Sequence, residues 1–375
     1  MNLCDYLIPV NNEPSLSTRS GTIGRNIITY GDDGGFKIPA SAKVALLGVP
    51  EDRFSDGAGE IKLPEQVRKQ LYALSSDAEN VVDLGNLRTG KTLLDTYFCL
   101  QHVVSELHAH GMVTVLIGGT IDLFYGGYLA FEGRKINLTG IIPSLRLPEQ
   151  GEEQHPLNRM IFEDNPEIHY CNIGYQSYYV HQQELDALKE KFAETYRLGE
   201  ATWNIADMEP VMRDSDIIAL SMNAVKYADA PAASITSPNG FTGEEVCQLA
   251  FYAGLSHRCK CMGIFDALPQ NDMQHITAKL IAQIVWYFIE GIKGRNTETP
   301  ETDAIGFKKY VIYYDQLHHD LCFYKHIKTN RWWMEVPSLK GKQHNEIISC
   351  TQEDYAKATE QEIPNRWWKI YQKIN

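Results

Sequence analysis

Hydrophobic and polar positions follow two alternating patterns between about residues 43 and 292. Short apolar runs recur, and longer segments with apolar residues three or four positions apart lie between them. A short run closed by Gly and Pro, such as 43–50, is typical of a strand buried on both faces. Apolar residues at helical spacing, such as Val67, Leu71 and Leu74, predict an amphipathic helix. The pattern therefore predicts strands that alternate with helices.

These elements predict a three-layer α/β/α fold with a mostly parallel sheet covered by helices on both faces. Thr242 and Glu245 have the spacing of a capping box, which marks one helix start. The expected strands cover 43–50, 113–117, 136–142, 168–173, 217–222 and 261–265. Two helices are expected to start at Pro64 and at Asp122. Five more are expected over 92–110, 182–192, 206–213, 243–255 and 273–292.

The two ends of the chain differ from this middle part. Residues 1–40 carry turn-forming residues without a sustained period and are expected to form an N-terminal arm. Residues 41–300 form the predicted α/β domain, which ends where the composition becomes polar. Residues 301–375 are a small aromatic extension, in which the β-prone runs 310–314 and 321–325 predict a hairpin.

A tetrad of residues occurs twice in this extension. Asn-Arg-Trp-Trp is found at 330–333 and again at 365–368, and it holds four of the six tryptophans. Trp and Arg are enriched at the energetic centres of protein interfaces. Two interpretations stay open, a partner surface or packing back onto the α/β domain. The side chains concerned are Arg331, Trp332, Trp333, Arg366, Trp367 and Trp368.

Charge and composition disfavour several classes of function. The 375 residues carry 35 Lys and Arg against 48 Asp and Glu, a formal charge of -13, which repels nucleic-acid backbones and anionic membranes. The N-terminus has no basic start followed by an apolar stretch of signal length, and no apolar run reaches the length of about 18 residues that a membrane span needs. We expect a cytoplasmic protein with neither nucleic-acid binding nor membrane insertion.

Several motifs in residues 43–292 have the order and spacing of one enzyme family. They are Val44-Ala-Leu-Leu-Gly-Val-Pro50, Gly57-Ala-Gly59, Pro64 with Val67-Arg68, Val115-Leu-Ile-Gly-Gly119, His155-Pro-Leu-Asn-Arg-Met-Ile161, Asn172-Ile-Gly174, Gly240-Phe-Thr-Gly-Glu-Glu245 and Ile264-Phe-Asp-Ala-Leu-Pro269. Together they resemble the ureohydrolase superfamily of arginase, agmatinase and formimidoylglutamase, and 155–161 resembles the formimidoylglutamase branch. The resemblance covers about two thirds of the chain and implies the arginase-like fold.

The resemblance also implies a chemistry that the matching positions do not support. Members of this family hydrolyse guanidino or formimino C–N bonds with two Mn²⁺ ions held by histidines and aspartates. Asp122 is the only acidic residue in the three matching segments, and one carboxylate cannot hold two divalent ions. We therefore expect no metal ligands and no cofactor. On this resemblance Thr120 stands at the aspartate that precedes the first histidine ligand, and the residues at the six ligand positions are Ile121, Ile142, Ser144, Arg146, Asn223 and Val225.

Two charged residues near these positions suggest what fills the site instead. Asp266 matches the position of the substrate-facing glutamate of the family. Arg146 stands at a former ligand position, where its guanidinium could occupy the vacated space and pair with Asp266 or Asp122. An unpaired buried arginine is costly, so the other interpretation is that Arg146 turns outward to solvent.

Three hypotheses for function follow. The leading one is a catalytically inactive ureohydrolase-fold protein that serves as a binding or scaffold subunit and holds a small polar ligand around Thr120, Asp122, Ser144, Arg146, Asn223 and Asp266. The second is an active formimidoylglutamase-like or agmatinase-like hydrolase of linear amidine C–N bonds, which would use manganese and ligands such as His318, His319 or His344. The third is a purely structural component of protein interactions. A protein partner or a homo-oligomer is expected.

Overall fold

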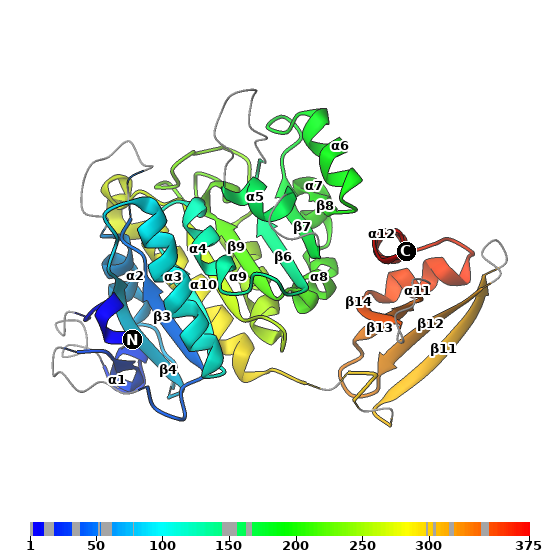
Figure 1. Cartoon of the computed structure of the whole chain (residues 1–375), viewed down its shortest axis with the longest axis horizontal. Helices are drawn as coiled ribbons and strands as arrows, with labels where there is room; N and C mark the ends of the chain where they lie inside the picture. The colour runs from blue at the N-terminus through cyan, green and yellow to red at the C-terminus, as the bar shows by residue number, and fades with distance from the viewer. Residues whose placement is uncertain are drawn as a thin grey trace.

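The structure is a computed structural model that describes most of the chain. The described residues are 3–10, 19–31, 38–51, 53, 62–77, 79–144, 156–162, 167–297, 299–302, 305–314, 319–338 and 345–375. They form an α/β body with a central sheet between two layers of helices, followed by a smaller extension (Figure 1). The three-layer prediction and the separate aromatic extension are confirmed.

The central sheet has ten strands in the order β1-β4-β3-β5-β10-β9-β6-β7-β8, and β2 also pairs with β4. Every pair is parallel except β1 with β4. The short strands β1 and β2 attach the described part of the N-terminal arm to β4. The strands are β1 (Leu7–Ile8), β2 (Ile28–Thr29), β3 (Val44–Gly48), β4 (Val81–Leu87), β5 (Val113–Ile117), β6 (Ile136–Ile141), β7 (Ile168–Tyr175), β8 (Glu194–Arg197), β9 (Ile217–Ser221) and β10 (Cys261–Phe265).

Helices cover both faces of this sheet, each over its own apolar core. One core is formed with α2, α8, α9 and α10, and the other with α3, α4, α5 and α6. Because both faces are buried, the strands inside the sheet are mostly apolar. The helices are α1 (Ile23–Asn26), α2 (Leu63–Leu71), α3 (Leu93–Ala109), α4 (Phe124–Leu129), α5 (Pro156–Phe162), α6 (Gln182–Glu190), α7 (Leu198–Trp203), α8 (Glu209–Asp214), α9 (Gly243–Leu255) and α10 (Ile276–Lys293).

Most predicted elements are confirmed, and the differences have local causes. The capping box is present, since Thr242 accepts from the amide of Glu245 and Glu245 accepts from the amide of Thr242. The last predicted helix begins three residues late, at Ile276, because Gln274 and His275 have left-handed backbone angles. Strand β4 was not predicted, since Asp83 interrupts its apolar pattern. Its buried carboxylate is paired with Arg68 (Nε to Oδ2, 2.8 Å).

The extension is an antiparallel sheet in the order β11-β12-β13-β14, with two helices packed against it. The predicted hairpin is confirmed, because β11 and β12 pair along their full lengths. Its core contains aromatic and aliphatic side chains from the sheet and from both helices. The elements are β11 (Phe307–Tyr314), β12 (His319–His326), β13 (Trp332–Val336), β14 (Glu346–Cys350), α11 (Gln352–Thr359) and α12 (Asn365–Ile374).

The two tetrads have different conformations and contacts. In the first, Trp332 and Trp333 begin β13; Trp332 stacks on Tyr355 (4.8 Å between ring centroids). In the second, Trp367 lies on α12 and donates its indole N–H to the carbonyl of Glu335 at 2.8 Å. Trp332, Trp333, Trp367 and Arg366 are buried within the chain, whereas Trp368 is 39% exposed. These contacts use most of the tetrad surface, and Arg331 pairs with Glu209 of the body (3.3 Å).

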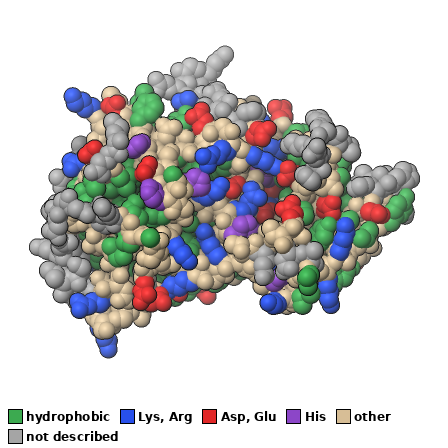
Figure 2. Space-filling view, turned by 60° about the horizontal axis from the view of Figure 1, so that its bottom comes forward, with side chains coloured by type: hydrophobic (Ala, Val, Ile, Leu, Met, Phe, Trp, Pro, Cys, Tyr) green, Lys and Arg blue, Asp and Glu red, His purple; other side chains and the backbone are tan. Residues whose placement is uncertain are grey.

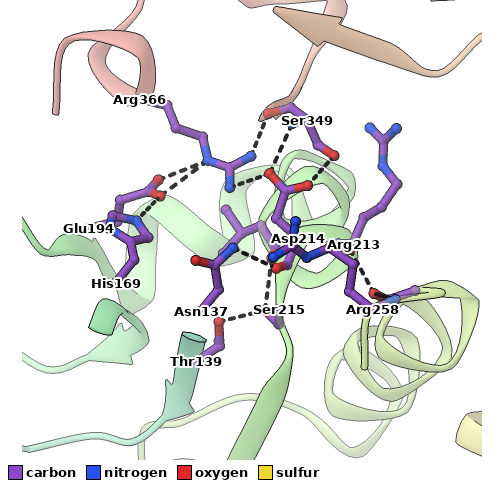
Figure 3. Close-up of polar contacts among 12 residues, drawn as sticks. Asn137, Thr139, His169, Glu194, Arg213, Asp214, Ser215, Arg258, Ser349 and Arg366 are labelled. Carbon is purple, nitrogen blue, oxygen red and sulfur yellow. Dashed lines mark hydrogen bonds and ion pairs between the residues drawn. The ribbon is translucent and has the colours of Figure 1, made fainter. Parts of the chain in front are cut away.

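Arg366 connects the extension to the body through buried carboxylates (Figure 3). Its Nε donates to Glu194 of β8 (3.1 Å to Oε2), and its Nη2 donates to Asp214 at the end of α8 (2.8 Å). Asp214 also accepts from the backbone N–H (2.9 Å) and the hydroxyl (2.5 Å) of Ser349 on β14. His169 donates from Nε2 to Glu194 at 2.8 Å. One arginine thus supplies the positive charge that pairs with two buried carboxylates.

These contacts lie at one edge of the central sheet. His169 and Glu194 are at the amino ends of β7 and β8, and Asp214 precedes the amino end of β9. The extension therefore docks at the edge opposite to the carboxyl ends of the parallel strands. None of the described helices has the length and hydrophobicity of a membrane span.

Replacing Arg366 by alanine should lower the free energy of unfolding by about 3–5 kcal/mol, because it leaves Glu194 and Asp214 buried without their cation. Chemical denaturation measures the loss. The matched control is Trp368→Ala in the same helix, which should change stability by less than about 1 kcal/mol because its side chain is partly exposed. Equal losses in the two variants would contradict this role of Arg366.

Stability should fall as the pH is lowered, in two steps. Burial lowers the pKa of His169 below its ordinary value of 6.5, against the opposing effect of Glu194. The unfolded chain therefore takes up a proton below about pH 6.5 that the folded chain does not, and stability is lost. Burial raises the pKa of Glu194, but Arg366 and the hydrogen bonds from His169 and Tyr196 outweigh burial and hold it below 4.5, so a further loss follows below about pH 4.5.

The variant His169→Gln separates the two steps. Glutamine keeps an N–H donor for Glu194 but does not titrate, so the loss of stability near pH 6.5 should shrink while the loss below pH 4.5 remains. Denaturation midpoints between pH 4 and pH 8 measure both. An unchanged profile near pH 6.5 would assign that step to another group.

Candidate functional site

The candidate site lies where four neighbouring strands end. The segments after β5, β6, β9 and β10 meet at the carboxyl edge of the sheet, where ligands of open α/β sheets bind. After β5, Gly118 (φ 112°) and Gly119 (φ 72°) make a turn in the left-handed region that favours glycine. This turn leads directly into the short helical turn Ile121–Leu123.

A cavity of about 460 Å³ lies between these segments. Its size suits a small molecule. Its described lining contains two carboxylates, several hydroxyls and two amides, with an apolar wall and no Lys, Arg or His. The lining residues are Thr120, Ile121, Asp122, Ile142, Pro143, Ser144, Asn158, Tyr179, Ser221, Asn223, Ser234, Ile235, Ser237 and Asp266.

Asp266 links three chain segments around the cavity through hydrogen bonds. Its Oδ1 accepts from the backbone N–H of Ile121 (3.0 Å), and its Oδ2 accepts from the hydroxyl of Ser221 (2.5 Å). Its own carbonyl accepts from the N–H of Ser234 at 2.8 Å. Asp266 is only 6% exposed and has φ of 66°, a left-handed conformation that is uncommon for a residue other than glycine. A rare conformation at a pocket is held by such surrounding contacts.

Asn223 fixes the segment that closes the other side of the cavity. Its Oδ1 accepts from the hydroxyl of Ser234 (3.0 Å) and from the N–H of Ile235 (2.8 Å). The hydroxyl of Ser221 accepts from the N–H of Asn223 at 3.2 Å. Through these bonds the end of β9 positions Ser234 and Ile235, which lie more than ten residues further along the chain.

Asp122 is the second carboxylate of the cavity and is 9% exposed. The hydroxyl of Thr120 donates to its Oδ2 at 3.3 Å. Burial raises the pKa of the Tyr97 phenol above its usual value, and the nearby charge of Asp122 raises it further. The described lining of the cavity therefore contains two carboxylates, Asp122 and Asp266.

The structure brings together most of the residues predicted for the site. Val225 is the exception, since it is fully buried in the core and does not line the cavity. Arg146 lies outside the described residues, as do His318 and His344, and of His319 only the backbone position at the start of β12 is described. The predicted residues that line the cavity are Thr120, Ile121, Asp122, Ile142, Ser144, Asn223 and Asp266.

Several lining residues were not identified from the sequence. Ser234, Ile235 and Ser237 come from the segment between β9 and α9, which has no strand end or motif that points to the site. Asn158 and Tyr179 come from α5 and from the turn after β7. Two of the lining residues had a signal in the sequence: Ser221 lies near the end of the predicted strand 217–222, and Asn158 lies in the motif 155–161.

The described residues do not fit a pair of manganese ions. Both carboxylate oxygens of Asp266 already accept short hydrogen bonds, and the remaining donors near Asp122 are hydroxyls and amides. Two divalent ions need several carboxylates or imidazoles. Within the described parts of the chain, no three His, Cys, Asp or Glu side chains are grouped as metal ligands.

Comparison with known proteins identifies relatives with this fold. No family model matches the chain. Formimidoylglutamase from Staphylococcus aureus (strain JH9) is 27% identical over 269 residues, which cover 66% of this chain and 86% of the relative. The structure of Trypanosoma cruzi formiminoglutamase with Mn²⁺ superimposes with a TM-score of 0.62 and 18% identity, over 70% of this chain and 97% of the other. Formimidoylglutamase from Bacillus subtilis gives 0.63 and 17%, over 74% and 94%.

The fold is therefore that of the ureohydrolase superfamily. Within this superfamily, the formimidoylglutamases are homologues of this chain in sequence. The resemblance inferred from the motifs is confirmed.

Replacing Asp266 by alanine should destabilise the protein by about 2–4 kcal/mol, because the N–H of Ile121 and the hydroxyl of Ser221 lose a buried charged acceptor. Asp266→Asn keeps one acceptor oxygen and tolerates the left-handed backbone, so it should cost about half as much. Urea denaturation measures both. If both variants unfold at the wild-type urea concentration, Asp266 does not hold these segments.

Proposed function

We propose that this protein binds a small cationic molecule in the cavity at the carboxyl edge of the sheet and does not hydrolyse it with a metal pair. The observation that carries the proposal is the composition of the described lining, with two carboxylates and many hydrogen-bond acceptors but no basic side chain and no histidine. Such a wall favours a ligand with positive charge and several N–H donors.

The side chains that line the cavity indicate the class of ligand. The carboxylate of Asp122 lines the cavity together with the hydroxyls of Thr120 and Ser144, while Ile142 and Ile235 provide apolar surface. A planar amidinium or guanidinium group can donate to a carboxylate in a paired manner and lie against an apolar wall. An amidine or guanidine with a short aliphatic chain therefore matches both parts of the cavity.

The comparisons favour a second candidate, hydrolysis of a formimidoyl C–N bond. The relatives are named formimidoylglutamase, and the Trypanosoma cruzi structure contains manganese. For this chain to act in the same way, metal ligands would have to come from residues beyond the described lining. The two candidates share a ligand class, because a formimidoyl group is itself an amidine.

Isothermal titration with agmatine, which carries a guanidinium, should detect binding to the wild-type protein. Asp122→Asn should weaken it by at least about tenfold, since a hydrogen bond to a charged group contributes about 1.5–3 kcal/mol. The matched control is Glu132→Gln, which removes the same charge from an exposed position near the end of α4 and should leave binding unchanged. Absence of binding by agmatine and by N-formimino-glutamate would reject the proposal.

The second candidate is tested separately with N-formimino-glutamate and added Mn²⁺. Water would cleave the formimidoyl C–N bond and give glutamate and formamide, so formamide release measures the reaction. We expect no release above that of the protein-free solution, together with less than one manganese per chain after dialysis. Turnover with two bound manganese ions would establish the hydrolase in place of our proposal.

A further inference from the structure

The two edges of the extension sheet have different surroundings. The edge formed by β14 faces the body, where Ser349 bonds to Asp214 and Glu346 pairs with Lys135 (2.5 Å). The opposite edge is formed by β11, and among the described residues no strand pairs with its outer side. Figure 1 shows β11 at the outer side of the extension, away from the body. The sheet therefore ends in one covered and one open edge.

The open edge has the composition of a strand that pairs. Strand β11 has eight residues, of which six are aromatic or β-branched. Tyr310, Ile312 and Tyr314 contribute to the core of the extension. Val311 and Tyr313, on the other face, are each 55% exposed. A long apolar edge strand presents unpaired N–H and C=O groups to any chain that can add a strand.

We propose that β11 pairs with β11 of a second copy of this chain. The strands run antiparallel about a twofold axis at Val311 and join two four-stranded sheets into one of eight strands. A twofold axis perpendicular to the sheet keeps each face continuous, so it pairs residues that lie on the same face. Such an interface uses one surface twice and closes on itself as a dimer.

This register matches the side chains of β11 to those of its copy. Val311 lies opposite Val311, Tyr310 opposite Ile312, Lys309 opposite Tyr313 and Lys308 opposite Tyr314. A lysine–tyrosine pair of this kind is already present within the chain. Lys309 Nζ lies 5.3 Å from the ring centroid of Tyr324, the residue opposite it on β12. The lysines of the two strands lie at opposite ends of the ladder, so like charges do not face one another.

The surroundings of the strand allow the pairing. At the extension end of the molecule, hydrophobic and basic side chains lie next to one another on the surface (Figure 2). Near the end of β11, the side chain of Gln361 donates to the carbonyl of Tyr313 at 3.0 Å. Gln361 is exposed, so water can satisfy its amide when a backbone N–H takes its place.

The variant Val311→Lys tests the interface, because it places two like charges opposite one another at the axis. Sedimentation analysis of the full chain should show a dimer that this variant weakens by more than about tenfold. Ile327→Lys is the matched control, since Ile327 is 52% exposed in the same sheet but lies in the turn after β12. If the α/β body forms an assembly of its own, Val311→Lys halves the wild-type mass. Equal masses for wild type and Val311→Lys would overturn the proposal.

A cysteine at the axis tests the register directly. The double variant Val311→Cys with Cys322→Ser introduces a thiol at the axis and removes the thiol of Cys322, the residue opposite position 311 on β12. Mild oxidation should join two chains through residue 311, whereas Ile327→Cys with Cys322→Ser should remain uncrosslinked. A wild-type dimer that Val311→Cys does not crosslink would reject this register, and a partner peptide of another protein on the edge would leave the purified chain monomeric.

Discussion

The structure depends first on the convergence of parallel strands. Because β5, β6, β9 and β10 are parallel neighbours, their carboxyl ends meet at one edge whatever side chains follow them. The cavity therefore exists although the described residues after these strands do not form a metal-ligand set. In a binuclear site, the attraction of carboxylates to two cations holds the segments in place. Here Asp266 does so through hydrogen bonds to Ile121 and Ser221.

A second constraint acts at the opposite edge, where Arg366 is buried. A guanidinium in this position must be paired, and Glu194 and Asp214 of the body pair with it. The extension is thereby fixed to the amino ends of β7, β8 and β9 and remains away from the cavity. Trp332, Trp333 and Trp367 are buried within the chain, so these side chains pack inside the protein.

The parts of the fold that the sequence predicts are those in which local pattern and burial agree. Strands such as β5 and β10 are mostly apolar, without charged residues, and were predicted at their observed bounds. Strands β4 and β8 contain the buried carboxylates Asp83 and Glu194 and were not predicted. Those carboxylates are stabilised by partners that a local pattern does not show. Arg366 lies 172 residues from Glu194, and the two identical tetrads form a strand start in one case and a helix start in the other.

The residues of the site also divide into those that the local sequence pattern indicates and those that depend on distant contacts. Residues that directly follow predicted strands, such as Thr120, Ser144 and Asp266, could be placed in it because the sheet determines where a strand ends. Ser234 and Ile235 could not, since they are positioned by hydrogen bonds to Asn223 and Asp266, which are distant from them in the sequence.

The extension and the cavity lie at opposite ends of the strands of the central sheet, so self-association through the extension need not involve the cavity. The extension contacts the amino edge of the central sheet, so two chains joined through β11 meet on that side of the molecule. The carboxyl edge, which contains the cavity, takes no part in this proposed pairing. Ligand binding and self-association can then occur independently, because neither uses a residue of the other. A chain whose body retains a pocket and whose extension retains an open strand can thus carry two separate recognition surfaces on one fold.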